Sequence, residues 1–132
     1  MEYSFAIHGH ENVLATHART IEFTKDAELT KNGDCIVGVK AEFFLDELKK
    51  FLHCGRVKIT VEAGGFSEAV TAVPNKKFNS SHELVIRLGE FDSERTFAVR
   101  ADKAAVHLGR ELVAALGRGA EGKVTISAGS DL

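Results

Sequence analysis

The amino-acid sequence predicts an α+β fold: a single β-barrel or sandwich-like domain built from two pseudo-repeated βββαβ units, with two flanking helices. Three observations support this prediction. Short segments alternate apolar and polar residues with the period of two of a half-buried strand. Two further segments carry apolar residues at helical spacing. The order of these segments in the first half recurs in the second, and a chain of 132 residues suits one domain, residues 1–132.

The repeat covers residues 2–65 and 67–130. Its clearest match joins Val57–Gly64 to Gly122–Gly129, where Lys, Thr, Ala and Gly recur at an offset of 65 (63 and 128). The same offset aligns His17 with His82, Ile21 with Ile86 and Phe23 with Leu88, whereas Val39–Ala41 matches Val99–Ala101 at an offset of 60 (39 and 99). We therefore expect the same strand order and helix placement in both units, arranged around a pseudo-twofold axis.

In the first unit, alternation predicts strands near residues 3–7, 17–24 and 35–40. The third is apolar on both faces, which is typical of a central strand. Residues 42–53 have helical spacing and predict a helix. In the closing strand, 57–62, Val57, Ile59 and Val61 should be buried and Lys58 exposed.

The second unit predicts strands near residues 67–73, 82–88 and 96–100, a helix over 102–117 and a strand over 123–128. Asp102 is expected to cap the helix, because its carboxylate can accept a hydrogen bond from a backbone N–H of the first turn. In the last strand, Val124 and Ile126 should be buried and Lys123 exposed.

Composition excludes several classes of protein. The 17 basic and 19 acidic residues give a formal net charge of -2, so no overall field attracts nucleic acid or an anionic membrane. The two cysteines, Cys35 and Cys54, have no CxxC spacing and indicate reduced thiols in the cytoplasm. No apolar run is long enough for a membrane span. We expect no membrane partner, nucleic-acid binding is disfavoured, and a homo-oligomer is compatible with the sequence.

Several runs of residues carry a family resemblance: Gly9–His17, Thr20–Asp26, Gly33–Ile36, Val61–Gly65 and Ser93–Ala105. In these runs, and over nearly the whole chain, the sequence resembles the archaeal domain-of-unknown-function family 371. The resemblance implies an archaeal source and a cytoplasmic protein. It implies no activity, ligand or catalytic residue.

The most specific chemical pattern is His8-Gly9-His10 followed by His17. Residues two apart share one face of a strand, so His8 and His10 could present two imidazoles side by side. Three neutral imidazoles can bind zinc or a similar divalent metal and leave one position open, with Glu22 or Asp34 completing the ligands. The alternative is that they are polar-face and turn histidines. The equivalents at an offset of 65 are Val73, Asn75 and His82, so the repeat itself does not require the cluster.

A second pattern groups charged residues around the predicted strand 96–100: Asp92, Glu94, Arg95, Asp102 and Lys103. Such a group could bind a polar ligand or pair a general acid with a base. Helix capping by Asp102 and surface ion pairs explain it more simply. We count Glu94, Arg95, Asp102 and Lys103, together with Asn12 and Asp34, as candidate ligand-binding residues.

A third pattern is basic. Cations gather at the end of the first predicted helix, and two lysines precede an aromatic residue in the loop before residue 82: Lys49, Lys50, His53, Arg56, Lys58, Lys76, Lys77 and Phe78. Cations can contact phosphates, and an aromatic ring can stack on a base. Cations at a helix C-terminus are also favoured by its dipole alone.

The function predicted from the sequence is that of a small cytosolic ligand-binding or accessory domain, with its site around His8, His10 and His17. The alternatives are a metal-dependent enzyme using the same cluster and a nucleic-acid-contacting module. A bound metal inside a pocket would favour the enzyme, and a contiguous basic face would favour nucleic acid. The sequence does not decide whether the protein is an enzyme.

Overall fold

The computed structural model describes residues 1–129 and contains eight strands, two α-helices and a short 3-10 helix. The strands and helices are, in chain order, β1 (Glu2–His8), β2 (Thr20–Thr24), β3 (Ile36–Gly38), α1 (Leu45–Lys49), β4 (Val57–Ala63), β5 (Phe66–Pro74), β6 (Glu83–Arg87), β7 (Thr96–Val99), η1 (Ala105–His107), α2 (Arg110–Gly117) and β8 (Glu121–Ser127). Every predicted strand is present, with bounds that differ by a few residues.

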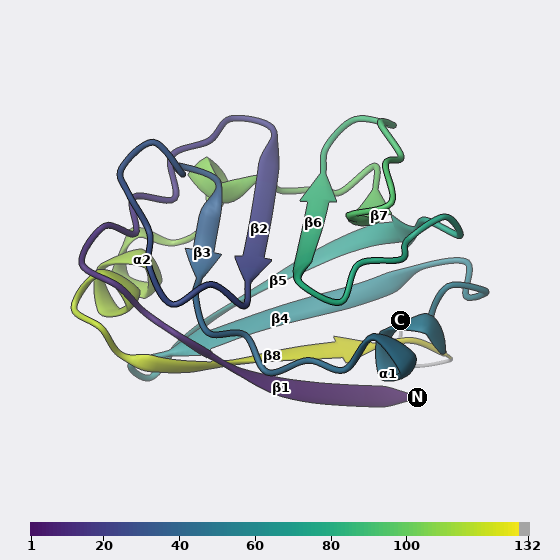
Figure 1. Ribbon diagram of the computed structural model, residues 1–132, viewed down its shortest axis with the longest axis horizontal. Helices are drawn as coiled ribbons and strands as arrows, with labels where there is room; N and C mark the ends of the chain where they lie inside the picture. Colours follow the sequence, from purple (N-terminus) through teal and green to yellow (C-terminus); the bar gives the residue numbers. More distant parts are fainter. Residues whose placement is uncertain (130–132) are drawn as a thin grey trace.

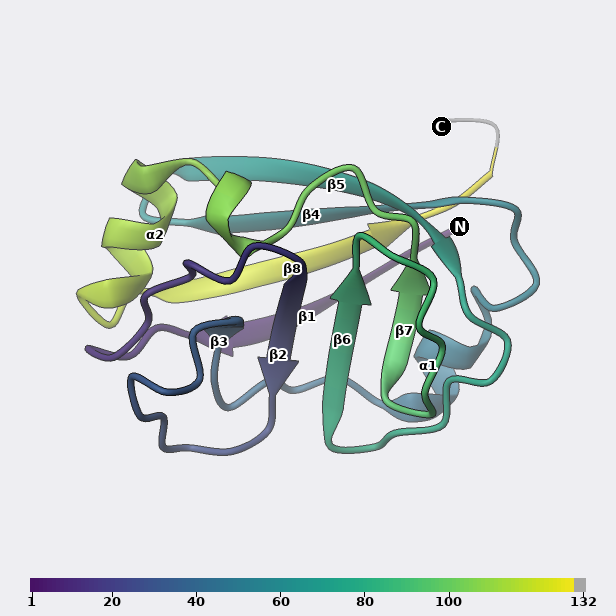
Figure 2. The same ribbon diagram turned by 90° about the horizontal axis from the view of Figure 1, so that it is seen from above.

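The strands form one mixed sheet in the order β1-β8-β4-β5-β7-β6-β2-β3. The long strands β1, β8, β4 and β5 are antiparallel neighbours, whereas β2–β3 and β6–β7 are parallel pairs. Figure 1 shows the short strands standing across the long ones, and Figure 2 shows the same two layers from above. α1 and α2 lie at opposite ends of the long strands. The predicted α+β class is confirmed.

The core lies between the two layers, because each layer turns its apolar face inward. The alternation predicted for β4 and β8 is confirmed: Val57, Ile59, Val61, Val124 and Ile126 are at most 1% exposed, whereas Lys58 and Lys123 are exposed. On the short strands, the inward residues are Ile21, Phe23, Leu84 and Ile86. This arrangement leaves the other face of β2 and β6 free for polar side chains.

The parallel pairs β2–β3 and β6–β7 share one irregular register. Glu22 pairs with Ile36 and Phe23 with Gly38, and the register shifts between the two pairs. Val85 and Ile86 pair with Thr96 and Ala98 with the same shift. Here the corresponding residues of β2 and β6 are 63 positions apart (22 and 85), not the predicted 65, so Ile21 corresponds to Leu84 instead of Ile86.

The two edges of the sheet meet at one point. His8, at the end of β1, exchanges both backbone hydrogen bonds with Val39, which follows β3, at 2.9 Å each. The β5–β7 pairing contains a corresponding contact between Val73 and Val99. One isolated bridge does not close the sheet, so the described fold is an open mixed sheet and the predicted barrel closure is not shown.

Both predicted helices are shorter than expected. The segment predicted as a helix over 42–53 forms α1 only over Leu45–Lys49 and then continues in tight turns, in which Phe51 and Leu52 donate to carbonyls three residues back. The turns place Phe51 and Leu52 in the core together with Leu48. Burial of these apolar side chains, and not a regular helix, accounts for their spacing.

The helix predicted over 102–117 is divided into η1 and α2. Asp102 caps no helix: its carboxylate accepts hydrogen bonds from the backbone N–H and the hydroxyl of Thr71, at 3.0 and 3.2 Å. Glu68 on β5 accepts the N–H of Gly109 at 2.8 Å, and Leu108 has extended backbone angles. Contacts to β5 therefore interrupt the helix that the local pattern predicts.

No helix within residues 1–129 has both the length and the apolar character needed to cross a membrane.

Candidate functional site

Buried polar side chains concentrate on one surface of the short strands. Among the described residues they are Thr20, Glu22, Thr24, Thr96 and Asn75, and all but Asn75 belong to β2 or β7. Antiparallel pairing places Thr20 opposite Arg87 and Thr24 opposite Glu83 on the same face. We call this face, with the neighbouring Cys35, Arg95 and Thr96, the polar strip. Buried polar groups in such numbers mark a candidate site, because each has to be compensated by a partner.

Glu22 lies at the centre of the polar strip and is 6% exposed. Its Oε1 is 3.7 Å from the Cys35 thiol and 3.7 Å from a guanidinium nitrogen of Arg95. Burial, followed by the hydrogen bond and charge of Glu83, raises the pKa of Glu22 to about 7, and Arg95 opposes that rise. The carboxyl group therefore changes its charge near neutral pH.

Cys35 has the opposite character to a reactive thiol. Burial raises its pKa to about 11, with the charge of Glu22 as the next cause. A thiol with this pKa is protonated at neutral pH and is a poor nucleophile. Cys35 consequently serves as a hydrogen-bond donor to Glu22, and both it and Cys54 are free.

At one end of the polar strip lies a pocket of about 290 Å³ that is open to the surface, which we call the Arg19–Arg87 pocket. Arg87 is held by a hydrogen bond from its Nε to Thr96 Oγ1, at 2.9 Å. Its guanidinium also lies 4.9 Å from the centre of the Phe91 ring. The pocket is lined by His17, Arg19, Thr20, Arg87, Gly89, Glu90 and Phe91.

His17 and Thr20 add polar groups to this pocket. The Nδ1 atom of His17 accepts the backbone N–H of Arg19 at 3.1 Å, so a neutral ring carries its proton on Nε2. Thr20 adds a hydroxyl from β2. The pocket thus combines two guanidinium groups, an imidazole and a hydroxyl, all of which can donate hydrogen bonds.

The charges of the pocket are not balanced. Within the described residues, neither Arg19 nor Arg87 makes an ion pair, and Glu90 pairs with Arg100 at 3.7 Å. Burial lowers the pKa of Arg87, and the nearby charge of Arg95 lowers it further. The guanidinium group is not deprotonated in proteins, so Arg87 stays charged. The pocket therefore presents positive charge.

The opposite end of the polar strip has the same backbone geometry but balanced charges. Lys25 donates its backbone N–H to the carbonyl of His82, as Leu88 does to that of Arg19. His82 and Asp26 form an ion pair of 2.8 Å. At the Arg19 end, the position of Asp26 is taken by Gly89, and a Cβ on Gly89 would lie 3.3 Å from an Arg19 guanidinium nitrogen.

The three predicted metal ligands have separate partners. His8 is 3.7 Å from the Glu42 carboxylate, and His10 is 3.5 Å from that of Glu28. His17 lies in the Arg19–Arg87 pocket. Across residues 1–129, no group of three or more histidine, cysteine, aspartate or glutamate residues could hold a metal ion. The structure corrects the predicted zinc site.

The reason lies in the end of β1. The strand stops at His8, and the next two residues donate to Ala120 and Leu116 at the α2–β8 connection. His10 has therefore left the alternation that would place it beside His8. The carbonyl of His17 is fixed to Val106 by a hydrogen bond of 3.1 Å.

The six predicted ligand-binding residues do not form one site. Asn12 donates to the carbonyl of Leu29 at 2.8 Å, and the backbone carbonyl of Asp34 accepts the N–H groups of Thr16 and His17. Both residues order the loops that precede β2 and β3.

The predicted charged group around residues 96–100 separates into two parts. Arg95 pairs with Glu83 at 3.2 Å and contacts Glu22 in the polar strip, and Glu94 accepts the backbone N–H of Asn79 through its carbonyl. Lys103 instead donates to the carbonyl of Ala69 at 2.6 Å, beside Asp102, which is bound to β5. Only Arg95 belongs to the candidate site.

The basic residues divide in a similar way. Lys49 and His53 share a hollow with Lys76 and Lys77, whereas Arg56 lines a neighbouring one. Lys50 pairs with Glu47 at 3.1 Å. The sequence suggested that the Phe78 ring could stack on a base. The structure excludes this, because Phe78 is only 1% exposed.

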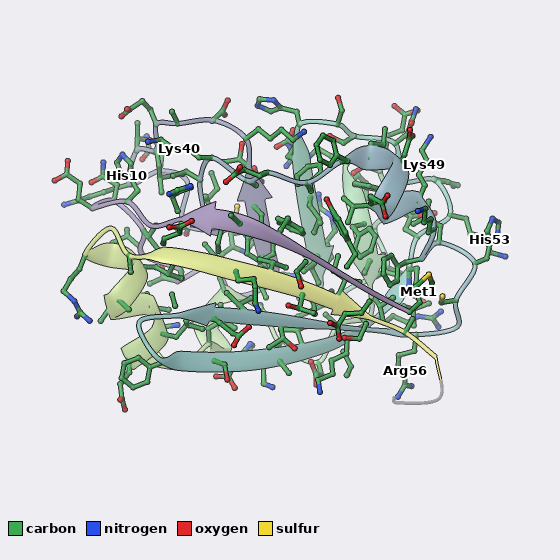
Figure 3. The ribbon with its side chains drawn as sticks, turned by 90° about the horizontal axis from the view of Figure 1, so that it is seen from below. Met1, His10, Lys40, Lys49, His53 and Arg56 are labelled. Carbon is green, nitrogen blue, oxygen red and sulfur yellow. The ribbon has the colours of Figure 1, made fainter. Side chains whose placement is uncertain are left out.

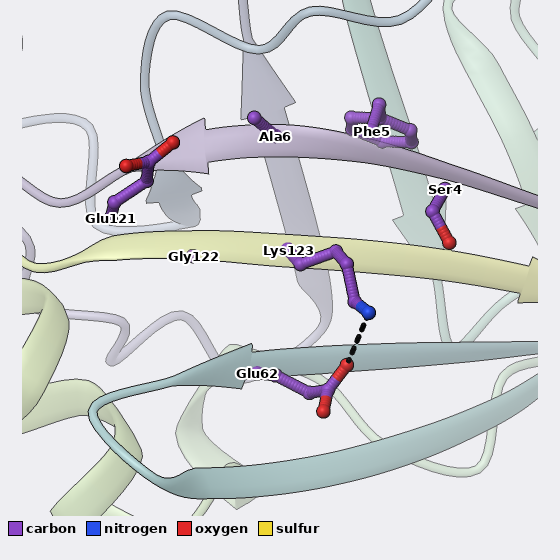
Figure 4. A pocket seen from close by; sticks show the side chains of 7 residues that line it. All are labelled: Ser4, Phe5, Ala6, Glu62, Glu121, Gly122 and Lys123. Atoms are coloured by element: carbon purple, nitrogen blue, oxygen red, sulfur yellow. Dashed lines mark ion pairs between the residues drawn. The ribbon is translucent and has the colours of Figure 1, made fainter.

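A further hollow, of about 500 Å³, lies on the outer face of β1, β8 and β4 and is drawn in Figure 4. Its charged side chains include Lys123 and Glu62, which pair with each other at 3.7 Å. The rest of its lining comes from Ser4, Phe5, Ala6, Glu121 and Gly122. This surface is shallow, and its ion pair satisfies itself, so it is a weaker candidate than the Arg19–Arg87 pocket.

The fold and site together define a mixed-sheet α+β domain with a positively charged pocket at one end of its β2–β6 pair. A family model described as "Domain of unknown function (DUF371)" matches residues 5–129. The chain is also 33% identical over 128 residues to an uncharacterized protein of Methanocaldococcus jannaschii, covering 92% of this chain and 95% of that protein. The chain belongs to the DUF371 family, as its sequence runs suggest.

Proposed function

We propose that this domain binds a small anionic ligand, carrying a carboxylate or phosphate group, in the Arg19–Arg87 pocket. One observation carries the proposal: two guanidinium groups line the same pocket, and neither makes an ion pair within the described residues. Arg19 is exposed and Arg87 is partly buried, so both guanidinium groups remain available to pair with a bound anion.

The donors fit such a ligand. A guanidinium presents its N–H groups as a planar fork that matches a carboxylate or a phosphate. Arg87 is held in place by Thr96, so little conformational entropy is lost when it binds. A pocket of about 290 Å³ suits a small molecule.

Phe91 supports a ligand with a planar or apolar portion. Its ring is 67% exposed although it lies beside the pocket. Pockets that bind small molecules are lined predominantly by apolar and aromatic side chains. The ring already packs against the Arg87 guanidinium, which would stay between the ring and the anion.

The test exploits the difference between the two ends of the polar strip. Gly89→Asp places a carboxylate where Asp26 stands at the other end, so Arg19 gains an internal partner. We expect calorimetric binding of inorganic phosphate or oxalate to weaken by tenfold or more. The reciprocal variant Asp26→Gly removes a carboxylate outside the pocket and should leave binding unchanged. Equal binding by the wild type and Gly89→Asp would contradict the proposal.

We do not propose a metal-dependent enzyme built on His8, His10 and His17, because the described residues contain no metal-binding group. The proposed binding site keeps only His17 from that cluster and makes no use of the other predicted ligands.

We also infer that the chain is an internal duplication of residues 2–65 and 67–130. The repeated register shift supports this, as do the left-handed residues Lys40 and Arg100, 60 positions apart (40 and 100), with φ of 50° and 52°. Non-glycine residues with such angles are uncommon.

We further propose a cytoplasmic location, which the two free cysteines support.

A further inference from the structure

A second positively charged surface lies away from the Arg19–Arg87 pocket, at the end of the molecule that carries α1. It is a hollow of about 530 Å³, which we call the basic hollow. Lys49 and His53 come from α1 and the turn after it, and Lys76 and Lys77 come from the β5–β6 connection. Two segments far apart in the sequence therefore contribute cations to one concave surface.

The charge of the basic hollow is only partly neutralised. Lys77 pairs with Asp92 at 3.1 Å, and Glu94 is the acidic residue of the lining. Within the described residues, Lys49 and Lys76 make no ion pair, and both are exposed. The positive charge is therefore local, on a chain whose formal net charge is -2.

The basic surface extends beyond the hollow itself. Figure 3 shows Lys49, His53, Arg56 and Met1 at the same end of the molecule, with His10 at the other. On the other side, the basic hollow shares Asn79 and Glu94 with a hollow lined by Ser80, Ser81, His82 and Arg95. Cations and hydroxyls thus follow a path longer than one small ligand, as the successive phosphates of a chain require.

The hollow offers no surface for reading bases. The Phe78 ring is buried and packs edge-on against Phe97, with 5.3 Å between ring centres. Contacts with a nucleic acid would therefore be limited to phosphate and sugar, which carry no sequence information. A flexible single strand can follow a concave path, whereas a duplex is stiff over this length.

We propose that the basic hollow binds the phosphate backbone of single-stranded nucleic acid, independently of base sequence. Lys49, Lys76 and Lys77 supply the phosphate contacts. The proposal does not depend on the Arg19–Arg87 pocket, which lies elsewhere on the molecule. Its affinity should be weak and should decrease as salt is added, because binding releases counterions from the phosphates.

The test is fluorescence anisotropy of a labelled single-stranded RNA with the full chain over a series of salt concentrations. Three phosphate contacts predict a slope of log K against log salt of about -2, at roughly 0.7 per contact. The double variant Lys49→Gln/Lys76→Gln should reduce the size of that slope by about 1.4. The matched control is Lys31→Gln/Arg118→Gln, which removes two exposed cations elsewhere and should leave the slope unchanged.

Three results would overturn the proposal: no RNA binding at low salt, binding that both double variants weaken equally, or a clear preference for one base sequence. Binding of anionic phospholipid vesicles without RNA would assign the surface to a membrane instead, and tight binding of inorganic phosphate alone would assign it to a small ligand. Gly89→Asp distinguishes the two proposals, because it should weaken anion binding in the Arg19–Arg87 pocket and leave RNA binding unchanged.

Discussion

The two ends of the β2–β6 pair have the same backbone and opposite electrostatics. At one end, His82 and Asp26 form an ion pair, and Arg95 pairs with Glu83. At the other, Arg19 faces Gly89, and no carboxylate within residues 1–129 pairs with it or with Arg87. Because the hydrogen bonds from Lys25 and Leu88 are equivalent, the fold does not cause this difference. One end uses its charges for its own stability, and the other keeps them available.

The largest expected effect comes from Arg87. Arg87→Ala removes a charged donor from the pocket, and charged hydrogen bonds contribute about 1.5–3 kcal/mol, so anion affinity should fall by roughly 10- to 100-fold. Arg95→Ala, at the balanced end, should leave affinity within a factor of about two and reduce stability instead. Calorimetry and urea unfolding of both variants measure the two effects. If Arg95→Ala reduced anion affinity and Arg87→Ala reduced only stability, the anion site would lie at the other end of the strip.

The second prediction concerns Glu22, which lies between the ends. Its folded pKa is raised from 4.5 to about 7, so the folded protein binds more protons than the unfolded chain between these values. The free energy of unfolding should therefore fall as pH rises from about 4.5 to 7, by roughly 2–3 kcal/mol, and should level off above. Glu22→Gln should remove most of this dependence and be more stable than the wild type at pH 8. Urea unfolding at pH 5 and pH 8 provides the measurement, and an unchanged pH dependence would show that other groups cause it.

A third prediction compares Gly38 with its counterpart Ala98. A Cβ on Gly38 would lie 2.7 Å from Ile7 Cδ1 and 2.9 Å from Ile7 Cβ. Gly38→Ala should therefore overpack the core and cost about 1–2 kcal/mol. Ile7→Val in the same chain should recover part of this loss, because it removes the nearer atom. Thermal unfolding of the single and double variants checks this, and an equal loss in both would place the strain elsewhere.

The smallest effect is expected at His82. The ring and its Asp26 partner are 56% and 62% exposed, so solvent screens their attraction. His82→Ala should cost less than about 1 kcal/mol, and less again in high salt. Unfolding in low and high salt measures this. A loss several times larger would mean that the balanced end has a function beyond stability.

The strands could be predicted from the sequence because their alternation is a local property. β4 and β8 show this most clearly, since each inward residue is apolar and each lysine between them is exposed. The helices could not be predicted as well. α2 begins late because Glu68 binds the N–H of Gly109, and no local pattern encodes a contact across 41 positions.

Most of the candidate site could not be predicted from the sequence, because its residues also meet only through long-range contacts. Arg19 and Arg87 lie far apart in the sequence and meet only through the antiparallel pairing of β2 with β6. One local signal was present: Thr20, Glu22 and Thr24 are polar at every second position of a strand whose other residues, Ile21 and Phe23, are apolar. The three histidines were predicted as metal ligands because they are close in sequence, but β1 ends between the first and the second of them.

β3 is a weakly held edge strand. It has three residues, and within residues 1–129 it is held by β2 and by the isolated bridge between His8 and Val39. Transient detachment of β3 would carry Cys35 away from Glu22 and into water. There its thiol would ionise near its ordinary pKa of about 8.5 and become reactive. The rate at which a thiol reagent modifies Cys35, measured against Cys54 in the same molecule, would thus report how often this edge of the protein opens.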